Sequence, residues 1–157
     1  MSRSPSAAVR AAVYPTRAKV PPVEGVASQT PAAPADERRD APSSLSCVIP
    51  CRNEAANLAL LLPRLRAVLG QLSPEWEIVL VDDGSVDDTA MQLADWTAES
   101  GVRVLQLSRN FGKEAALSAG LAAAHGRVVV LMDADLQHPP ELIVQMVEHW
   151  RRGAEVV

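Results

Sequence analysis

The fold class of this chain is decided by one stretch, Val128-Val129-Val130-Leu131-Met132-Asp133-Ala134-Asp135, in which an unbroken apolar run leads into two acids. A run of large apolar residues is typical of a strand that is covered on both faces, as in a parallel sheet. Carboxylates held close together at the end of such a strand repel each other unless a positive charge lies between them. A hard divalent cation would supply that charge and keep positions open for phosphate oxygens. The stretch therefore predicts a site for a nucleotide diphosphate at the edge of a parallel sheet.

On both sides of this stretch, strand-like and helix-like patterns alternate along the chain. Apolar runs predict strands over 45–50, 76–81, 102–107 and 128–132, and a fifth strand that begins at Ala154. Helical spacing predicts helices over 57–69, 85–99 and 113–124, and one that begins at Pro139-Pro140. Ser85 is predicted to cap the second helix, with Asp88 in its first turn. The alternation predicts an α/β fold, with a mostly parallel sheet, right-handed crossovers and helices on both faces.

The N-terminal part of the chain differs in composition from the rest. Residues 1–43 contain seven of the twelve prolines and no sustained apolar period. Such a segment buries too little surface to offset its loss of conformational entropy, so we expect a disordered Ala/Pro-rich tail. One domain is expected over 44–157. Because Val156 and Val157 are apolar and no polar cap follows them, we expect the chain to be truncated within a strand.

The charge of the expected domain limits its partners. The chain has a formal net charge of −4, whereas residues 44–157 carry nine basic and fifteen acidic residues. An acidic domain argues against nucleic acid as a partner and suits a bound metal. No apolar stretch reaches the roughly 20 residues that span a bilayer, and the N-terminus lacks the apolar centre of a secretory signal.

The two cysteines are predicted to be reduced. Cys47 and Cys51 lie four residues apart on one predicted strand, where their Cα atoms would be about 13 Å apart. That distance exceeds the roughly 7 Å limit for a disulfide. Buried thiols of a cytosolic protein are therefore expected.

Three predicted strands end in polar sequences that could carry chemistry. These are Pro50–Glu54, Asp82–Ser85 and Asp133–His138. Ligands of doubly wound sheets bind beyond the carboxyl ends of the strands, so we expect the three segments to share one cleft with five or six carboxylates. Each acid alone has an ordinary explanation as a turn residue or a helix cap. The coincidence of three acidic strand ends favours a site.

Two alternatives follow from the same residues. A phosphoacceptor receiver domain also places an acidic pair after an apolar strand, as Asp82-Asp83 does, and Asp133 lies near the position of its phosphorylated aspartate. The predicted strand at 45–50 and the lack of a lysine after a later strand argue against that domain. Dinucleotide binding is weaker still, because no G-x-G-x-x-G spacing follows any predicted strand.

Taken in order, the strand-end segments resemble glycosyltransferase family 2, the inverting nucleotide-sugar transferases with a Rossmann-like GT-A fold. The resemblance covers about residues 44–157. Ser46–Glu54 is similar to the opening strand and loop of the family, and Val81–Ser85 to its second signature. Asp133-Ala134-Asp135 is similar to its metal-binding D-x-D motif.

The resemblance implies roles for the matching residues. Asp133 and Asp135 would hold Mg²⁺ or Mn²⁺ on the diphosphate of a UDP- or GDP-sugar. Asp135 and Gln137 are implied as catalytic residues, with Gln137 beside the metal and the sugar. The residues implied to bind the nucleotide-sugar are Pro50, Asn53, Glu54, Asp82, Asp83, Lys113, Asp133 and Ala134. The metal would neutralise charge on the departing nucleoside diphosphate.

Two further stretches, Arg109–Ala115 and Asp135–Glu141, are similar to the branch of the family that includes dolichol-phosphate mannose synthases and bacterial undecaprenyl-phosphate sugar transferases. This branch implies a polyprenyl phosphate acceptor, which is already largely ionised at neutral pH because its second pKa is about 6. A strong general base is then less necessary. The resemblance also implies a location in the cytoplasm or at the cytoplasmic face of the inner membrane, and leaves open a homo-oligomer through a C-terminal part. We expect this chain to hold the donor-binding part and to have little transferase activity alone. A non-catalytic nucleotide-binding remnant is the alternative.

Overall fold

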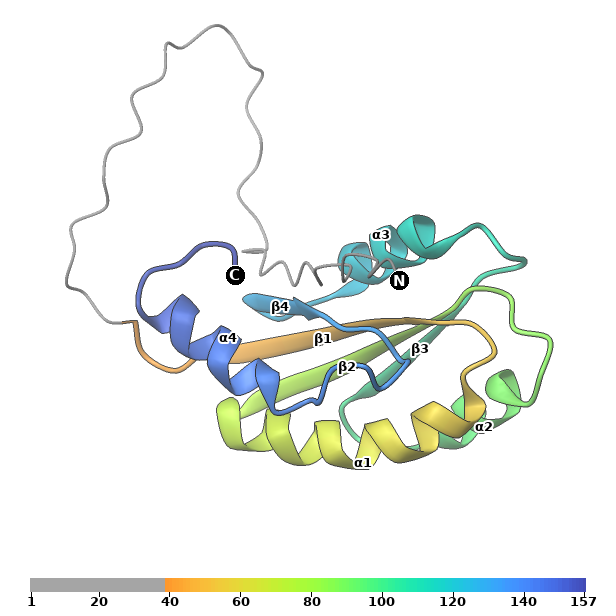
Figure 1. The fold of residues 1–157 in the computed structure, drawn as a ribbon, viewed down its shortest axis with the longest axis horizontal. Coiled ribbons are helices and arrows are strands. Elements are labelled where there is room, and N and C mark those ends of the chain that lie inside the picture. The colour runs from red at the N-terminus through yellow and green to blue at the C-terminus, as the bar shows by residue number, and fades with distance from the viewer. Residues whose placement is uncertain (1–38) are drawn as a thin grey trace, which may run out of the picture.

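The apolar runs form a parallel sheet with the strand order β3-β2-β1-β4 (Figure 1). A computed structural model describes residues 39–157, and residues 1–38 of the predicted tail lie outside the described residues. The strands of the described part are β1 (Ser44–Cys51), β2 (Glu75–Asp82), β3 (Val102–Gln106) and β4 (Val128–Leu131). The helices are α1 (Ala55–Leu72), α2 (Thr89–Trp96), α3 (Lys113–Ala123) and α4 (Leu142–Arg151). The predicted α/β fold with a parallel sheet is confirmed.

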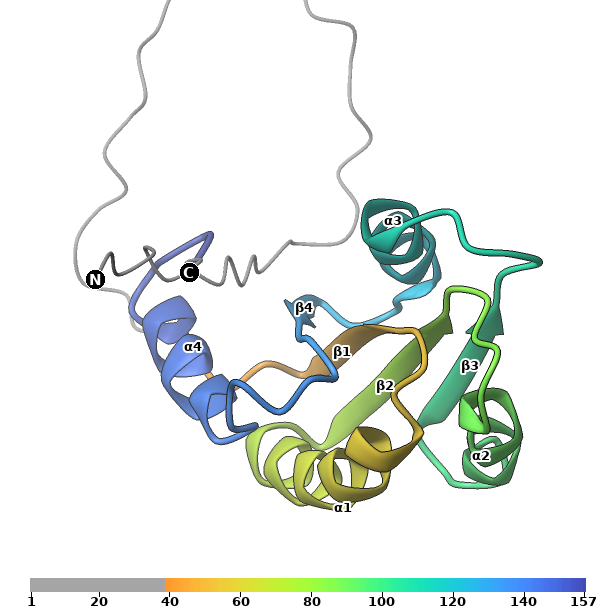
Figure 2. The same ribbon diagram turned by 45° about the vertical axis from the view of Figure 1, so that its right-hand side comes forward.

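Helices cover both faces of the sheet. Figure 2 shows α3 on one face and α1, α2 and α4 on the other. The pleat of β1 separates the two cores, because successive side chains of a strand point to opposite faces. Leu45, Cys47 and Ile49 of β1 pack with the leucines of α1, whereas Val48 packs toward α3 with Ala116.

The close approach of α3 to the sheet depends on Gly120. This glycine is buried, and a Cβ atom at its position would collide with the side chain of Val48 and come within 3.0 Å of Val81 Cγ2. A larger residue would therefore push α3 away from β1 and β2.

The strand order places the topological reversal between β1 and β4. The chain passes from β1 to β2 to β3 in one direction and then returns to pair β4 with the other side of β1. In an open parallel sheet, ligands bind beyond the carboxyl ends of the strands at such a reversal. The residues that follow Cys51 and Leu131 therefore lie where a ligand is expected.

The structure differs from the sequence predictions at several helix boundaries and at the last strand. The first helix spans Ala55–Leu72 instead of 57–69, and the fourth begins at Leu142 instead of Pro139. The second helix begins at Thr89, not at Ser85, and it ends at Trp96. The predicted fifth strand at Ala154 is wrong. Gly153 has a φ of 100°, and the backbone N–H of Ala154 donates to His149 O at 3.1 Å, so this segment completes the end of α4 instead of pairing with the sheet.

At the amino ends of the strands, Glu77 fixes the turn between α3 and β4. Its Oε1 accepts hydrogen bonds from Ser46 Oγ and from the backbone N–H of His125, both at 2.6 Å, and its Oε2 lies 3.1 Å from Arg103 Nη1. Burial alone would raise the pKa of Glu77, but the hydrogen bonds from Ser46, His125 and Arg103 and the Arg103 charge hold that pKa below its ordinary value. Ser46 Oγ also accepts the N–H of Gly126 at 2.8 Å, so the start of β4 is tied to β1.

Candidate functional site

The carboxyl ends of β1, β2 and β4 border one cleft of about 430 Å³. The residues that line it are Pro50, Cys51, Arg52, Glu54, Asp83, Asn110, Gly112, Lys113, Asp133, Ala134 and Asp135. The three predicted strand ends therefore meet, as expected. Four carboxylates line the cleft, fewer than the expected five or six, and Asp82 lies outside its lining.

Asp133 and Asp135 lie on the turn that follows β4. Asp133 Oδ1 is 2.6 Å from Lys113 Nζ, across the cleft on α3. Asp135 is exposed, and its Oδ1 accepts the backbone N–H of Gln137 at 3.0 Å. Ala134 between them is buried in the core, and Leu136 has a φ of 59° and packs against the same core. These apolar anchors hold the turn while both carboxylates remain at the cleft.

Asp83 follows β2 and holds the loop that leads into α3. It is almost fully buried, and its two carboxylate oxygens accept the backbone N–H groups of Phe111 (2.7 Å) and Gly112 (2.9 Å). Its own N–H donates to Cys51 O at 2.9 Å. Asp83 therefore joins the end of β1 to the start of α3, and it lines the cleft as well.

The neighbouring acid, Asp82, has a local role in the structure. Its Oδ1 accepts hydrogen bonds from both the N–H and the hydroxyl of Ser85, at 2.9 and 2.5 Å. Ser85 Oγ also accepts the N–H of Asn53 at 3.0 Å, and Asn53 Oδ1 accepts the N–H of Val86 at 2.9 Å. Ser85 therefore links two loops and does not cap a helix.

Glu54 begins α1 and borders the cleft. Its Oε2 accepts a hydrogen bond from Asn57 Nδ2 at 2.6 Å, and its backbone N–H donates to Thr89 Oγ1 at 2.9 Å. The side chain is held at the N-terminus of α1, where the helix dipole favours a negative charge.

Cys51 also lines the cleft, but its thiol is not poised to react. Burial, with smaller contributions from the charges of Asp82, Glu54 and Asp87, raises the pKa of Cys51 to about 12. Its Sγ donates to Val81 O at 3.5 Å. Cys47 is fully buried, and burial raises the pKa of this thiol to about 12. Both cysteines are free, as predicted.

Among the predicted site residues, the cleft gathers Pro50, Glu54, Asp83, Lys113, Asp133, Ala134 and Asp135. Asn53, Asp82 and Gln137 lie outside its lining, although Gln137 is two residues from Asp135. Four lining residues were not predicted from the sequence: Cys51, Arg52, Asn110 and Gly112. A signal for all of them existed, because each lies in a stretch on which the family resemblance rests.

The carboxylates of Asp133 and Asp135, at the end of β4, fit a hard divalent cation whose other ligands include phosphate oxygens. Mg²⁺ is commonly held by one or two carboxylates together with substrate phosphates and water. Within residues 39–157, no group of three or more His, Cys, Asp or Glu residues forms a cluster that could hold a metal. Asp133 and Asp135 are the two carboxylates that line the cleft at the end of β4.

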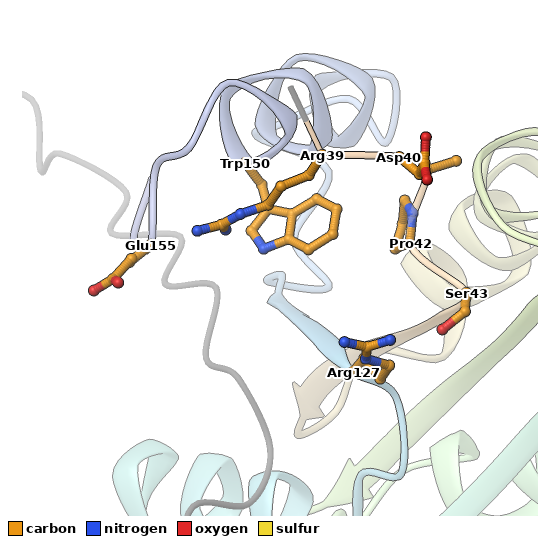
Figure 3. Close-up of a pocket in the computed structure, with 8 residues that line it drawn as sticks. Arg39, Asp40, Pro42, Ser43, Arg127, Trp150 and Glu155 are labelled. Carbon is orange, nitrogen blue, oxygen red and sulfur yellow. The ribbon is translucent and has the colours of Figure 1, made fainter. Parts of the chain in front are cut away.

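A second and larger cavity, of about 810 Å³, lies near the amino ends of β1 and β4. Figure 3 shows Arg39 against the indole of Trp150, and Arg127 on the far side of the cavity. The Arg39 guanidinium lies 5.2 Å from the Trp150 ring centre, and the Arg39 backbone N–H donates to Arg151 O at 2.7 Å. Ligands of parallel sheets bind at the other end of the strands, so the smaller cleft is the candidate site.

Among the helices of residues 39–157, none combines the length and the apolar character that crossing a bilayer requires.

A family model matches most of this chain. The model, described as glycosyl transferase family 2, matches residues 46–157. The chain therefore belongs to glycosyl transferase family 2, as the strand-end motifs predicted. This membership argues against the receiver domain that the pair Asp82-Asp83 had left open.

Similar proteins support the same assignment. The undecaprenyl-phosphate 4-deoxy-4-formamido-L-arabinose transferase of Pseudomonas fluorescens is 48% identical over 115 residues, which cover 72% of this chain and 34% of that protein. This chain spans about a third of the length of the curated relatives that it matches.

Solved structures agree with the GT-A fold. A mannosyltransferase from Pyrobaculum calidifontis, in complex with GDP-Man and Mn²⁺, has a TM-score of 0.62 and 24% identity, and the match covers 78% of this chain and 36% of that one. Glucosyl-3-phosphoglycerate synthase from Mycobacterium tuberculosis, in complex with Mn²⁺, UDP and glucosyl-3-phosphoglycerate, has a TM-score of 0.54 and 28% identity. That match covers 67% of this chain and 38% of the synthase.

Proposed function

We propose that this chain forms the donor-binding part of an inverting, metal-dependent glycosyltransferase that moves a sugar from a UDP- or GDP-sugar to a polyprenyl phosphate. The observation that carries the proposal is the single cleft in which Asp83, Asp133 and Asp135 lie together with Lys113. Acids from two strand ends and a cation from a helix start fit a metal-bound diphosphate.

The residues proposed for the site differ in the part of the ligand that they would serve. Asp133 and Asp135 would hold Mg²⁺ or Mn²⁺, and Lys113 would contact the diphosphate. Gln137 follows Asp135 on the same turn and would lie beside the metal and the sugar. Residues proposed to bind or shape the nucleotide pocket are Pro50, Asn53, Glu54, Asp82, Asp83 and Ala134.

The hydrogen bonds of three of these residues bear on how they would act. Asp83 already uses one lone pair of each carboxylate oxygen to hold the loop before α3, so it would shape the pocket and contact the base or ribose through what remains. Asn53 and Asp82 hold the loops at the ends of β1 and β2 through Ser85. Their contribution to nucleotide binding would come from this fixed loop geometry.

The chemistry proposed for the site is departure of a nucleoside diphosphate. A divalent metal, when bound, would neutralise the charge that develops on this leaving group. Lys113, at the N-terminus of α3, would add a second positive charge on the same side. The cleft contains no histidine among its lining residues, which is consistent with an acceptor that is already ionised.

The acceptor is inferred from the relatives. The similar Pseudomonas fluorescens enzyme is named for undecaprenyl phosphate, and a lipid monophosphate needs little help from a general base at neutral pH. The transfer would take place at the cytoplasmic face of the inner membrane in the whole protein. The homo-oligomer left open by the resemblance stays a prediction.

The proposal is tested by thermal unfolding of the chain with UDP or GDP, in the presence of Mn²⁺ or of EDTA. A nucleotide at a concentration of 100 times its Kd would stabilise the fold by about 2.7 kcal/mol. We expect protection by at least one of the two nucleotides with Mn²⁺ and its loss with EDTA. The absence of protection by both nucleotides, or stabilisation by beryllofluoride in their place, would contradict the proposal.

A second test asks whether residues 1–157 transfer the sugar by themselves. Residues 1–157 are incubated with a radiolabelled nucleotide-sugar and polyprenyl phosphate. We expect nucleotide binding without appreciable transfer to lipid. Robust turnover by this chain alone would show that it holds more than the donor-binding part.

A further inference from the structure

One ion pair joins two residues that the proposed function assigns to different ligands. Lys113 Nζ lies 2.6 Å from Asp133 Oδ1, and the two side chains are 59% and 31% exposed. Lys113 is assigned to the diphosphate and Asp133 to the metal. A metal held by Asp133 would therefore compete with the Lys113 ammonium group for this carboxylate.

The position of Lys113 is unfavourable for a lysine by local rules. It is the first residue of α3, where the positive end of the helix dipole disfavours a cation. The capping residue, Gly112, provides no side-chain hydrogen bond to this helix end. Glu114 in the first turn and the Asp83 carboxylate at Gly112 add negative charge to this helix end. The carboxylate paired with the Lys113 ammonium group is that of Asp133, across the cleft. A residue that breaks a local rule at the edge of a cleft is expected to serve the site.

The backbone of Lys113 is held in place, so a change of ion-pair partner requires only a rotation of its side chain. Asp83 accepts the N–H groups of the two preceding residues, Phe111 and Gly112. The α3 helix itself is packed against the sheet through Gly120. The ammonium group can therefore exchange partners within the cleft without a movement of the helix.

We propose that Lys113 pairs with Asp133 when no metal is bound, and that its ammonium group moves to the diphosphate when a metal-bound nucleotide enters. The inference rests on the proposed function. In the absence of nucleotide, the metal and Lys113 would compete for the Asp133 carboxylate. In the presence of nucleotide, both would contact the diphosphate and no longer compete. Metal and nucleotide would therefore bind more tightly together than separately.

Lys113→Gln should change the two affinities in opposite directions. Without nucleotide, the variant should bind Mn²⁺ more tightly, by roughly two- to fivefold, as expected when a part-exposed ion pair no longer competes. With saturating Mn²⁺, the same variant should bind UDP or GDP less tightly, because the diphosphate has lost one cation. A residue with only a structural role would not produce this reversal of sign.

The affinity for Mn²⁺ alone is measured by electron paramagnetic resonance of free Mn²⁺, titrated into the chain of residues 1–157. Arg52→Gln is the charge-matched control, because Arg52 lines the same cleft and its side chain has no ion pair with Asp133 in the structure. We expect Lys113→Gln to tighten Mn²⁺ binding more than Arg52→Gln does. Equal effects of the two substitutions, or no effect of either, would overturn the inference. Lys113 would then affect Mn²⁺ binding no more than any other positive charge at the cleft.

The nucleotide arm uses calorimetry with UDP and with GDP at saturating Mn²⁺. We expect Lys113→Gln to bind the nucleotide more weakly than the unchanged chain. Unchanged or tighter nucleotide binding would overturn the proposed movement of Lys113 from Asp133 to the diphosphate. Asp133→Asn separates this failure from that of the proposed function. If Asp133→Asn lowers the affinity for Mn²⁺ while Lys113→Gln leaves it unchanged, the metal site stands and the inference is wrong. If Asp133→Asn has no effect on Mn²⁺ binding, the proposed metal site is wrong too.

Discussion

Asp83→Asn should destabilise the fold although the two side chains have nearly the same shape. In the structure, each oxygen of the buried Asp83 carboxylate accepts one backbone N–H, from Phe111 at 2.7 Å and from Gly112 at 2.9 Å. An asparagine keeps one acceptor oxygen and turns an NH₂ group toward the other backbone N–H. The variant therefore loses one charge-assisted hydrogen bond and sets an NH₂ group against a backbone N–H, a cost of about 1.5–3 kcal/mol.

The neighbouring acid provides a matched control. Asp82 is equally buried, but a single oxygen, Oδ1, accepts both hydrogen bonds from Ser85. The amide oxygen of Asp82→Asn can keep both, so we expect a smaller loss, of about 1 kcal/mol. Urea denaturation followed by circular dichroism gives the free energies of unfolding of both variants. Hydrogen exchange at the amides of Phe111 and Gly112 reports the loop itself.

The result that would refute this reasoning is specific. If Asp83→Asn and Asp82→Asn lose the same free energy of unfolding, and exchange at Phe111 and Gly112 is unchanged, then Asp83 does not hold the loop before α3. Its place at the cleft would then have to be explained by ligand contact alone.

Three other predictions follow from the packing and the electrostatics. Gly120→Ala should destabilise the fold by about 1–3 kcal/mol in urea denaturation, because its Cβ would collide with Val48. Gly70→Ala in α1, where a Cβ would meet only Trp76 Nε1 at 3.6 Å, should instead stabilise by up to about 1 kcal/mol; equal effects of the two substitutions would contradict the packing argument. Because the pKa of Glu77 is lowered in the folded state, its contribution to stability is present above its unfolded pKa of about 4.3 and is lost as the pH falls through the folded value. Unfolding midpoints measured from pH 7 down to pH 3 should therefore fall less steeply in Glu77→Gln than in the unchanged chain, and parallel curves would remove Glu77 as a source of acid sensitivity.

The sheet could be predicted from the sequence because its strands are buried on both faces. Runs such as Val128–Met132 contain no polar residue, and such runs are typical of parallel strands that helices cover on both faces. The position of the cleft followed from the same pattern, because parallel strands bring their carboxyl ends to one edge. The amino-acid pattern alone therefore predicts Asp83, Asp133 and Asp135 at this edge.

The contacts that hold the site together could not be predicted in the same way. Ser85 has the spacing of a helix cap, but Asp82 and Asn53 take its hydrogen bonds. Asn53 is distant in the sequence, so local spacing gave no sign of it. Val156 and Val157 have the composition of a strand, yet the segment before them closes the end of α4. A short apolar segment becomes a strand only where a neighbouring strand pairs with it.

The central claim is that the acids at the ends of β2 and β4 serve one metal-bound nucleotide. Calorimetry of Asp135→Asn with UDP and GDP, with and without Mn²⁺, tests it most directly, and Asp95→Asn on the exposed face of α2 removes the same charge away from the cleft. We expect Mn²⁺-dependent nucleotide binding to be lost in Asp135→Asn and retained in Asp95→Asn. An Asp135→Asn variant that binds nucleotide with the affinity and the Mn²⁺ dependence of the unchanged chain would contradict the account.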